Sequence, residues 1–380
     1  MDNHRYDVVF LNFSVPLETR YSTMGELVNL VFNLNRIGVK SGICIIPPIN
    51  FDSDKFSKSR NNLSLNIWNS LSMHKITASL VRRLLLKNSN EDLKNINILK
   101  VKNFDDLTKI DTRYMASWLW ESAYVLNKIK LPDKVKKLQI LHYGWIPEFL
   151  TDYFPEKHLT MFKEMYFSNM TKIAISKEQF NDFKDVKVYH WLQGINLKIF
   201  FNKKNGINQT LQILIPLRRP REKGAIYAIK AAEIIHHHNS NVKIISYGDY
   251  TGNIPDFMEH RGRVDMNDLI QLYRNSDIFI LPSIQEGFSF PGLEAMASGC
   301  VVVSTKNGGS EQYIIDGVNG FLVENCNGEA IAEKVLELLN NKEYLNTIIK
   351  NAQVSVLEFS YEKAADRFKN ILEEIDNSQQ

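Results

Sequence analysis

Glu286 and Glu294, eight positions apart, stand in the run of the chain whose residue types and spacing are best suited to chemistry. Carboxylates accept hydrogen bonds from hydroxyl groups, so a pair of them can hold a polyol such as a sugar or a ribose. Between them, Ser289 is followed by Phe290 and Pro291, a pattern that predicts a helix N-terminus with the serine as its cap. The free N–H groups of such a terminus suit a phosphate. Phosphate binding beside polyol binding indicates a nucleotide sugar.

The segments around these residues predict a strand–helix–strand unit. Residues 277–282 are an apolar run typical of a buried parallel strand, 290–298 form a short helix, and 300–304 form a second strand. Because the connection is right-handed and the strands are parallel neighbours, the loops 283–289 and 305–310 leave the same carboxyl edge of the sheet. Open α/β sheets bind their ligands at this edge.

A second candidate element is the basic loop after the strand predicted over 211–217. It contains Arg218 and Lys223, and two fixed cations at the end of a strand can hold a diphosphate and neutralise a leaving group. Basic loops are also common on solvated surfaces, so the phosphate interpretation depends on the position of this loop between a strand and a helix. His142 follows the strand predicted over 138–141, where a catalytic and a purely structural histidine both remain open.

Length and composition bound the class of protein. The 380 residues suit two domains, and 44% hydrophobic with 23% charged residues is typical of a globular protein. A net charge of +3 gives no indication of nucleic-acid binding. We find no apolar run of membrane-spanning length and no signal peptide, and the three cysteines lack metal-ligand spacing. These features predict a cytoplasmic protein.

Two further segments leave alternatives open. Apolar residues recur at helical spacing within 76–90 and are flanked by Arg and Lys, which fits either an ordinary packed helix or a helix that touches the inner face of an anionic membrane. Trp118 and Trp120 lie in an aromatic segment over 114–124. Packing in a core is the favoured reason for them, although aromatic rings also stack on sugars.

The run from Glu286 to Gly299 resembles the Glu-x7-Glu signature of retaining glycosyltransferases of family 4, also called group 1. Arg218 and Lys223 match the spacing of that family's Arg and Lys-Gly, and 193–200 (QGINLKIF) resembles its crossing between domains. The resemblance implies the GT-B architecture, in which two Rossmann-like α/β domains with parallel sheets face each other across a cleft. It also implies a C-terminal helix that crosses back to the first domain.

On this basis we expect three parts of the chain. Residues 1–200 form an acceptor-side domain, 201–357 form the nucleotide-sugar domain, and 358–380 form the returning helix. The first loop departs from the family, because many members carry a glycine pair there and this chain offers only Gly25. Gly25 and Arg20, which lies in the same predicted loop, are the candidates on the acceptor side.

The resemblance implies metal-independent transfer of a sugar from a nucleoside diphosphate sugar to an acceptor hydroxyl, with retention. Arg218 and Lys223 would hold the diphosphate, Glu286 the sugar and its transition state, Glu294 the ribose, and His142 would lie near the transferring sugar. We expect no cofactor and a UDP-linked donor, with the reaction serving polysaccharide or glycoconjugate synthesis. The remaining donor-binding candidates surround the base and the phosphates: Arg263, Val264, Gly287, Phe288, Ser289 and Phe290.

Two other functions stay open at this point. One is a GT-B enzyme with another reaction, such as an epimerase or a phosphorylase, although an epimerase would need an acid/base set that we do not find. The other is a non-catalytic partner in a glycosylation complex, although this chain retains all four charged site residues. The acceptor is expected to be a glycan, a lipid-linked molecule or a protein, and no feature indicates nucleic acid. The oligomeric state is not determined by these patterns.

Overall fold

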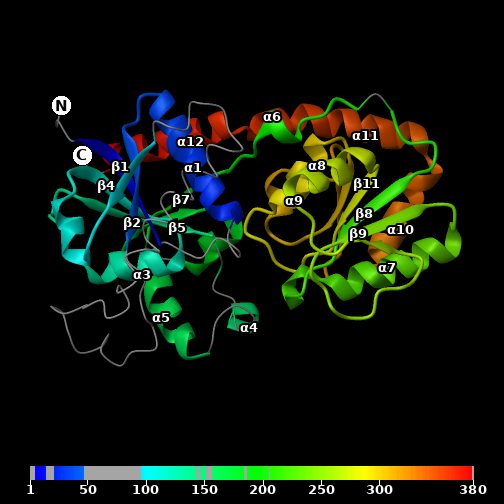
Figure 1. Cartoon of the computed structure of the whole chain (residues 1–380), viewed down its shortest axis with the longest axis horizontal. Coiled ribbons are helices and arrows are strands. Elements are labelled where there is room, and N and C mark those ends of the chain that lie inside the picture. Colours follow the sequence, from blue (N-terminus) through cyan, green and yellow to red (C-terminus); the bar gives the residue numbers. More distant parts are fainter. Residues whose placement is uncertain are drawn as a thin grey trace.

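The computed structural model describes residues 5–13, 21–46, 96–142, 144, 147–150, 156–183, 186–204 and 206–378. Arg20 and the basic segment 76–90 lie outside the described residues. The described chain forms two α/β units, each built on one parallel sheet (Figure 1). The predicted fold class is therefore confirmed.

The first sheet has seven parallel strands in the order β3-β2-β1-β4-β5-β6-β7. Successive residues of a strand point to opposite faces. Val8 and Phe10 of β1 accordingly belong to one buried cluster and Val9 and Leu11 to another. The strands are β1 (Tyr6–Phe13), β2 (Ser41–Ile46), β3 (Asn97–Lys100), β4 (Thr112–Ser117), β5 (Lys136–Leu141), β6 (Thr171–Ala174) and β7 (Val188–His190).

Helices cover both faces of this sheet (Figure 1). α1 (Tyr21–Arg36) packs against α12 (Tyr361–Asn377), the last helix of the described chain, and both contribute to the cluster of Phe10. α3 (Trp120–Lys128) and α5 (Glu156–Tyr166) contribute to the other cluster. The short helix α4 (Pro147–Leu150) follows β5.

The second sheet has six parallel strands in the order β10-β9-β8-β11-β12-β13. The predicted strand–helix–strand unit is confirmed, because β11 pairs in parallel with β12 and α9 connects them. The strands are β8 (Gln212–Pro216), β9 (Lys243–Tyr247), β10 (Glu259–His260), β11 (Ile278–Leu281), β12 (Val301–Thr305) and β13 (Phe321–Val323). The helices are α7 (Ala225–His238), α8 (Met266–Asn275), α9 (Phe290–Ala297), α10 (Gly328–Asn340) and α11 (Lys342–Ser355).

The chain passes between the sheets twice, at adjacent points. The outgoing segment leads into α6 (Leu197–Phe200), and the amide of Ile195 donates to the carbonyl of Phe359 on the return, at 2.8 Å. α12 then lies along the first unit, where the Tyr114 hydroxyl donates to the carbonyl of Leu372 at 3.2 Å. The predicted return of the C-terminal helix is confirmed, whereas the exact domain limits near 200 and 357 stay predictions.

Several local expectations differ from the structure. The sequence predicts no strand in the aromatic segment 114–124, yet the start of this segment belongs to β4 and its end to α3. Trp118, within the same segment, is fully buried, as the core-packing interpretation predicts. β3 was not predicted at all, because NILK is short and half exposed. Asn341 separates two successive helices, α10 and α11. Gly25 lies inside α1 and not in the loop before it.

Candidate active site

The two predicted loops lie together at the carboxyl edge of the second sheet and touch the first unit. The amide of Glu286 donates to the carbonyl of Asn307 at 2.8 Å, which joins the loops to each other. Ser176 Oγ donates to the carbonyl of Gly308 at 3.3 Å, which joins them to the segment after β6. The predicted edge of the second sheet is therefore where the two units touch.

Lys223 and Glu286 form an ion pair in this edge. Lys223 Nζ lies 3.1 Å from Glu286 Oε1, and Ser283 Oγ donates to the same oxygen at 2.8 Å. The Glu286 side chain is 14% exposed and that of Lys223 25%, so both groups are largely shielded but still reach solvent. A cation and a carboxylate from different loops are thus held at one point, and both are partly exposed to solvent.

Gly224 explains why a glycine follows this lysine. It has a φ of +66°, and a Cβ there would lie 1.9 Å from the carbonyl oxygen of Pro282. Only glycine combines a left-handed backbone with such a close approach at little cost. The residue lets the turn of Lys223 pass directly over the end of β11 and so brings the ammonium to Glu286.

Arg218 and Arg263 converge on one carboxylate that the sequence analysis missed. Arg218 Nε lies 3.6 Å from Asp249 Oδ1 and Arg263 donates to Asp249 Oδ2 at 3.1 Å. Burial alone would raise the pKa of Asp249, but hydrogen bonds from the Arg219 amide and from Arg263 hold it below its usual range. Both arginines are more than half exposed, so their guanidinium groups are open to a ligand while Asp249 fixes their position.

The turn at the start of α9 differs from the prediction. Ser289 stands at the cap position but in a left-handed conformation, with φ +63°, and its side chain makes no capping hydrogen bond. Its Oγ is buried and has no partner among the described residues. The N–H groups of Phe288, Ser289 and Phe290 likewise have no acceptor in the described part of the chain. This cluster of unused donors is what binding of an anion or a hydroxyl requires.

Glu294 lies one turn into α9 and accepts a hydrogen bond from the Tyr273 hydroxyl at 3.3 Å. Burial raises the pKa of Glu294 to about 7, and the Tyr273 contact only partly opposes this. The side chain is half-buried. A carboxylate that ionises near neutrality inside the interface is a strong acceptor for ligand hydroxyls when it is charged.

His142 faces the same edge from the first unit. Its carbonyl oxygen would lie 2.6 Å from a Cβ added to Gly287, so the two units approach closely there. The ring packs edge-on against Trp118, with centroids 4.8 Å apart, and its Nε2 is buried without a partner among the described residues. Burial lowers the pKa of His142 to about 4, so the ring is neutral at pH 7.

The other candidates divide between core and surface. The Phe288 side chain is 2% exposed and packs on aromatic rings, so only its backbone can serve a ligand. Val264 packs partly buried against the core beside Arg263, and Phe290 lines a small pocket. Gly25, inside a helix, is not the predicted loop glycine. No group of three or more His, Cys, Asp or Glu residues able to hold a metal occurs in the described part of the chain.

Asp249 and Ser283 carried weak sequence signals. Asp249 comes two residues after the end of β9, and Ser283 two residues after the end of β11, which are the positions where the carboxyl edge begins. A search confined to strand ends would have found both. Tyr273, in contrast, reaches Glu294 from within α8, and only tertiary packing shows that contact.

Comparisons with known proteins concern the family and the fold of this chain. Residues 198–355 match the family model of the glycosyl transferases group 1. The uncharacterized glycosyltransferase MJ1178 of Methanocaldococcus jannaschii is 29% identical over 191 residues, 48% of this chain and 52% of that protein. CapM of Staphylococcus aureus, a capsular polysaccharide biosynthesis glycosyltransferase, is 31% identical over 146 residues, 36% of this chain and 38% of that protein. The chain thus spans about half the length of MJ1178, and less of CapM.

The fold comparison covers both units. The crystal structure of Anabaena HepE in complex with UDP-glucose superposes with a TM-score of 0.67 at 15% identity, over 97% of this chain and 99% of that one. At this identity the likeness concerns the fold, which is GT-B. Over residues 198–355, which carry the second sheet, the chain is similar to the group 1 family of glycosyl transferases.

Proposed function

We propose that this protein is a retaining glycosyltransferase that moves a sugar from a nucleoside diphosphate sugar to an acceptor hydroxyl. The observation that carries the proposal is the convergence, at one edge, of the Lys223–Glu286 pair with the N–H groups of 288–290, which have no acceptor among the residues that the structure describes. A cation and amide donors suit the diphosphate, and a carboxylate suits the sugar.

The charges can stabilise both halves of the breaking glycosidic bond. Negative charge develops on the leaving diphosphate, where Arg218, Lys223 and the turn amides supply fixed positive charge and donors. Positive charge develops at the anomeric carbon, where Glu286 supplies a fixed carboxylate. These groups are held by the protein before the donor arrives, so little reorganisation is needed during the reaction. A bound metal is not required for this division of charge.

The donor's nucleoside would occupy the outer part of the same edge. Glu294 would accept from the ribose hydroxyls, and Arg263 with Val264 would border the base. His142 and Ser289 each hold a buried polar atom without a partner among the described residues, and these would meet the transferring sugar. Approach of the acceptor hydroxyl from the side of the leaving group would give retention.

We propose a UDP-linked hexose as the donor and synthesis of a polysaccharide or glycoconjugate as the setting. The HepE complex contains UDP-glucose and CapM is named for capsular polysaccharide biosynthesis, which supports both points. No helix among the described residues is long and apolar enough to cross a membrane. A cytoplasmic location, with a peripheral contact at the inner membrane face, stays a prediction.

The test is donor hydrolysis across a panel of nucleotide sugars in EDTA, for the wild-type protein and for Glu286→Gln. We expect slow release of one nucleoside diphosphate by the wild type and a loss of about 100-fold in the variant, which is typical when one transition-state contact is removed. Binding of the free nucleotide should change little. No hydrolysis and no thermal stabilisation by any nucleotide would reject the proposal and favour a non-catalytic partner.

A further inference from the structure

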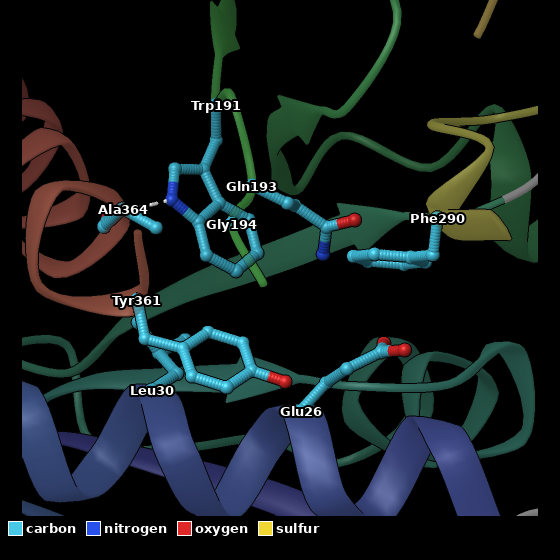
Figure 2. A pocket seen from close by; sticks show the side chains of 8 residues that line it. All are labelled: Glu26, Leu30, Trp191, Gln193, Gly194, Phe290, Tyr361 and Ala364. Carbon is cyan, nitrogen blue, oxygen red and sulfur yellow. Dashed lines mark hydrogen bonds between the residues drawn. The ribbon is translucent and has the colours of Figure 1, made fainter. Parts of the chain in front are cut away.

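A small pocket lies where the two crossings between the sheets meet (Figure 2). α1 contributes Glu26, the outgoing crossing Gln193, α9 Phe290, and α12 Tyr361. Its volume is about 10 Å³, which is about enough for one water molecule. Because it is bordered by both units, a change in this pocket acts on the interface that carries the donor site.

The pocket contains an unused hydrogen-bond acceptor. Gln193 is 2% exposed, and its Oε1 has no hydrogen-bond partner among the described residues. Figure 2 shows the carboxyl group of Glu26 and the hydroxyl of Tyr361 pointing toward the space beside this amide. A buried acceptor needs a donor, and an ionised carboxylate cannot supply one. A protonated Glu26 can.

Glu26 also lies close to the donor-site carboxylate. Phe290 and Glu294 are four residues apart on α9 and so share a helix face, which places Glu294 one turn from the pocket. Burial, and then the charge of Glu294, raise the pKa of Glu26 well above its usual range. The other titratable groups here include Tyr361 on α12, Tyr273 on α8 beside Glu294, and Tyr247 on β9, whose hydroxyl lies 3.3 Å from that of Tyr273. No Lys or Arg of the described chain forms an ion pair with either glutamate.

We propose that Glu26 is a positioning residue for donor binding: an uncharged carboxylic acid that donates a hydrogen bond to Gln193, directly or through one water, and leaves Glu294 as the one charged carboxylate beside it. The inference rests on the proposed function, in which Glu294 holds the ribose. Figure 2 shows Nε2 of Gln193 on the side of Glu26. A half-turn of the amide exchanges two groups of the same size and brings Oε1 to that side.

This arrangement gives donor binding two pH limits. As the pH falls, Glu294 is protonated and becomes a weaker acceptor for the ribose. As the pH rises, Glu26 loses its proton, so the hydrogen bond to Gln193 is lost and two carboxylates repel each other at the interface. The second carboxyl group of a like-charged pair ionises after the first, so the alkaline limit lies above the acid one.

The experiment measures the affinity of the full chain for UDP by calorimetry between about pH 5.5 and about pH 9.5, on both sides of neutrality. We expect wild-type binding to weaken beyond each limit, by at most about tenfold per pH unit, which is the steepest slope that one proton can give. Glu26→Gln keeps the shape but has no charge at any pH, so it should lose the alkaline limit and keep the acid one. Glu362→Gln, a change at a half-exposed glutamate on α12, should keep both.

A second readout needs no nucleotide. Because folding raises the pKa of Glu26, the ionised form is disfavoured in the folded protein, and wild-type stability falls as the pH rises from the unfolded toward the folded pKa. The unfolding temperature of Glu26→Gln minus that of the wild type should therefore grow with pH. A constant difference, or an alkaline limit that persists in Glu26→Gln, would overturn the role of Glu26. If the wild type bound no UDP at any pH, the donor site would be rejected instead. The pH dependence of the unfolding temperatures would then be the only test of whether Glu26 is buried as an uncharged acid.

Discussion

The ammonium of Lys223 lies 3.1 Å from Oε1 of Glu286, although the two residues are 63 positions apart in the chain. The contact forms because β8 and β11 are neighbouring parallel strands, so the turns that follow them meet at one edge. One of these turns brings the cation for a phosphate and the other the carboxylate for a sugar. The candidate site is therefore a consequence of strand order.

Replacing Lys223 with Gln should weaken UDP binding about 10- to 100-fold, because a hydrogen bond to a charged group contributes about 1.5–3 kcal/mol. Calorimetric titration of UDP measures this change. Lys230→Gln is the matched control, since Lys230 is 53% exposed on α7 and pairs with Glu329 at 3.9 Å. Equal losses in both variants would indicate a general effect of charge and would contradict a direct contact.

Arg218→Gln and Arg219→Gln form a second matched pair. The side chain of Arg218 is held beside Asp249, whereas Arg219 uses only its backbone amide toward that carboxylate. We expect Arg218→Gln to weaken UDP binding about tenfold, the equivalent of about 1.4 kcal/mol, and Arg219→Gln to change it less than about twofold. A greater loss in Arg219→Gln would show that the wrong arginine has been assigned to the diphosphate.

The sequence predicted most of the second unit because its signals are local. Short apolar strands, the helix after Ser289 and the basic loop all follow from residue types within a few positions. It failed where a neighbour far along the chain decides the structure: Asp249 gains its role only when β9 lies beside β8. The residue type of Ser289 predicts a helix cap, but the turn adopts a left-handed conformation and leaves the serine hydroxyl unpartnered in the described chain.

The first unit was harder to predict for the same physical reason. Thr112–Ser117 (TRYMAS) lacks a continuous apolar run, yet it is a central strand between β1 and β5. Its polar residues are satisfied inside the sheet, as where Thr112 Oγ1 donates to the carbonyl of Tyr114 at 2.9 Å. Periodicity alone cannot detect a strand whose polar side chains are paired in the interior.

Glu294→Gln should make the protein more stable and bind UDP less well. Folding raises the pKa of this group from 4.5 to about 7, so the protonated form is favoured in the folded state. Wild-type stability should therefore fall as the pH rises from about 4.5 to about 7 and then stay level. Glu294→Gln has no carboxyl group at this position, so its stability should not decrease over this pH range. The unfolding temperature of the variant minus that of the wild type should therefore increase between these two pH values and reach its maximum by pH 8.

Calorimetry with UDP at pH 8 checks the other half of this prediction, because Gln can accept fewer hydrogen bonds from the ribose than a carboxylate. Glu343→Gln, at an exposed position in the first turn of α11, is the control and should follow the wild type in both measurements. A Glu294→Gln variant that gains stability equally at pH 4 and pH 8 would show that its effect is not the removal of a titrating carboxyl.

Gly224→Ala should disturb the site without changing a charged group. The new Cβ would lie 1.9 Å from the carbonyl oxygen of Pro282, on a backbone with φ +66°, so the turn must move. We expect a loss of about 2–4 kcal/mol in the free energy of unfolding from overpacking and left-handed strain together. Lys223 precedes this glycine directly, so UDP affinity should fall as well.

Gly206→Ala is the control for this change, because a Cβ at Gly206 would meet no atom within 4 Å and its φ is not in the left-handed range. Denaturant unfolding should give it a free energy within about 0.5 kcal/mol of the wild type. If Gly224→Ala had the same free energy of unfolding as Gly206→Ala, the turn would tolerate a side chain at position 224. The close approach of Gly224 to Pro282 would then not be the reason that Lys223 lies against Glu286. If it lost stability but kept full UDP affinity, the position of Lys223 would not depend on that turn.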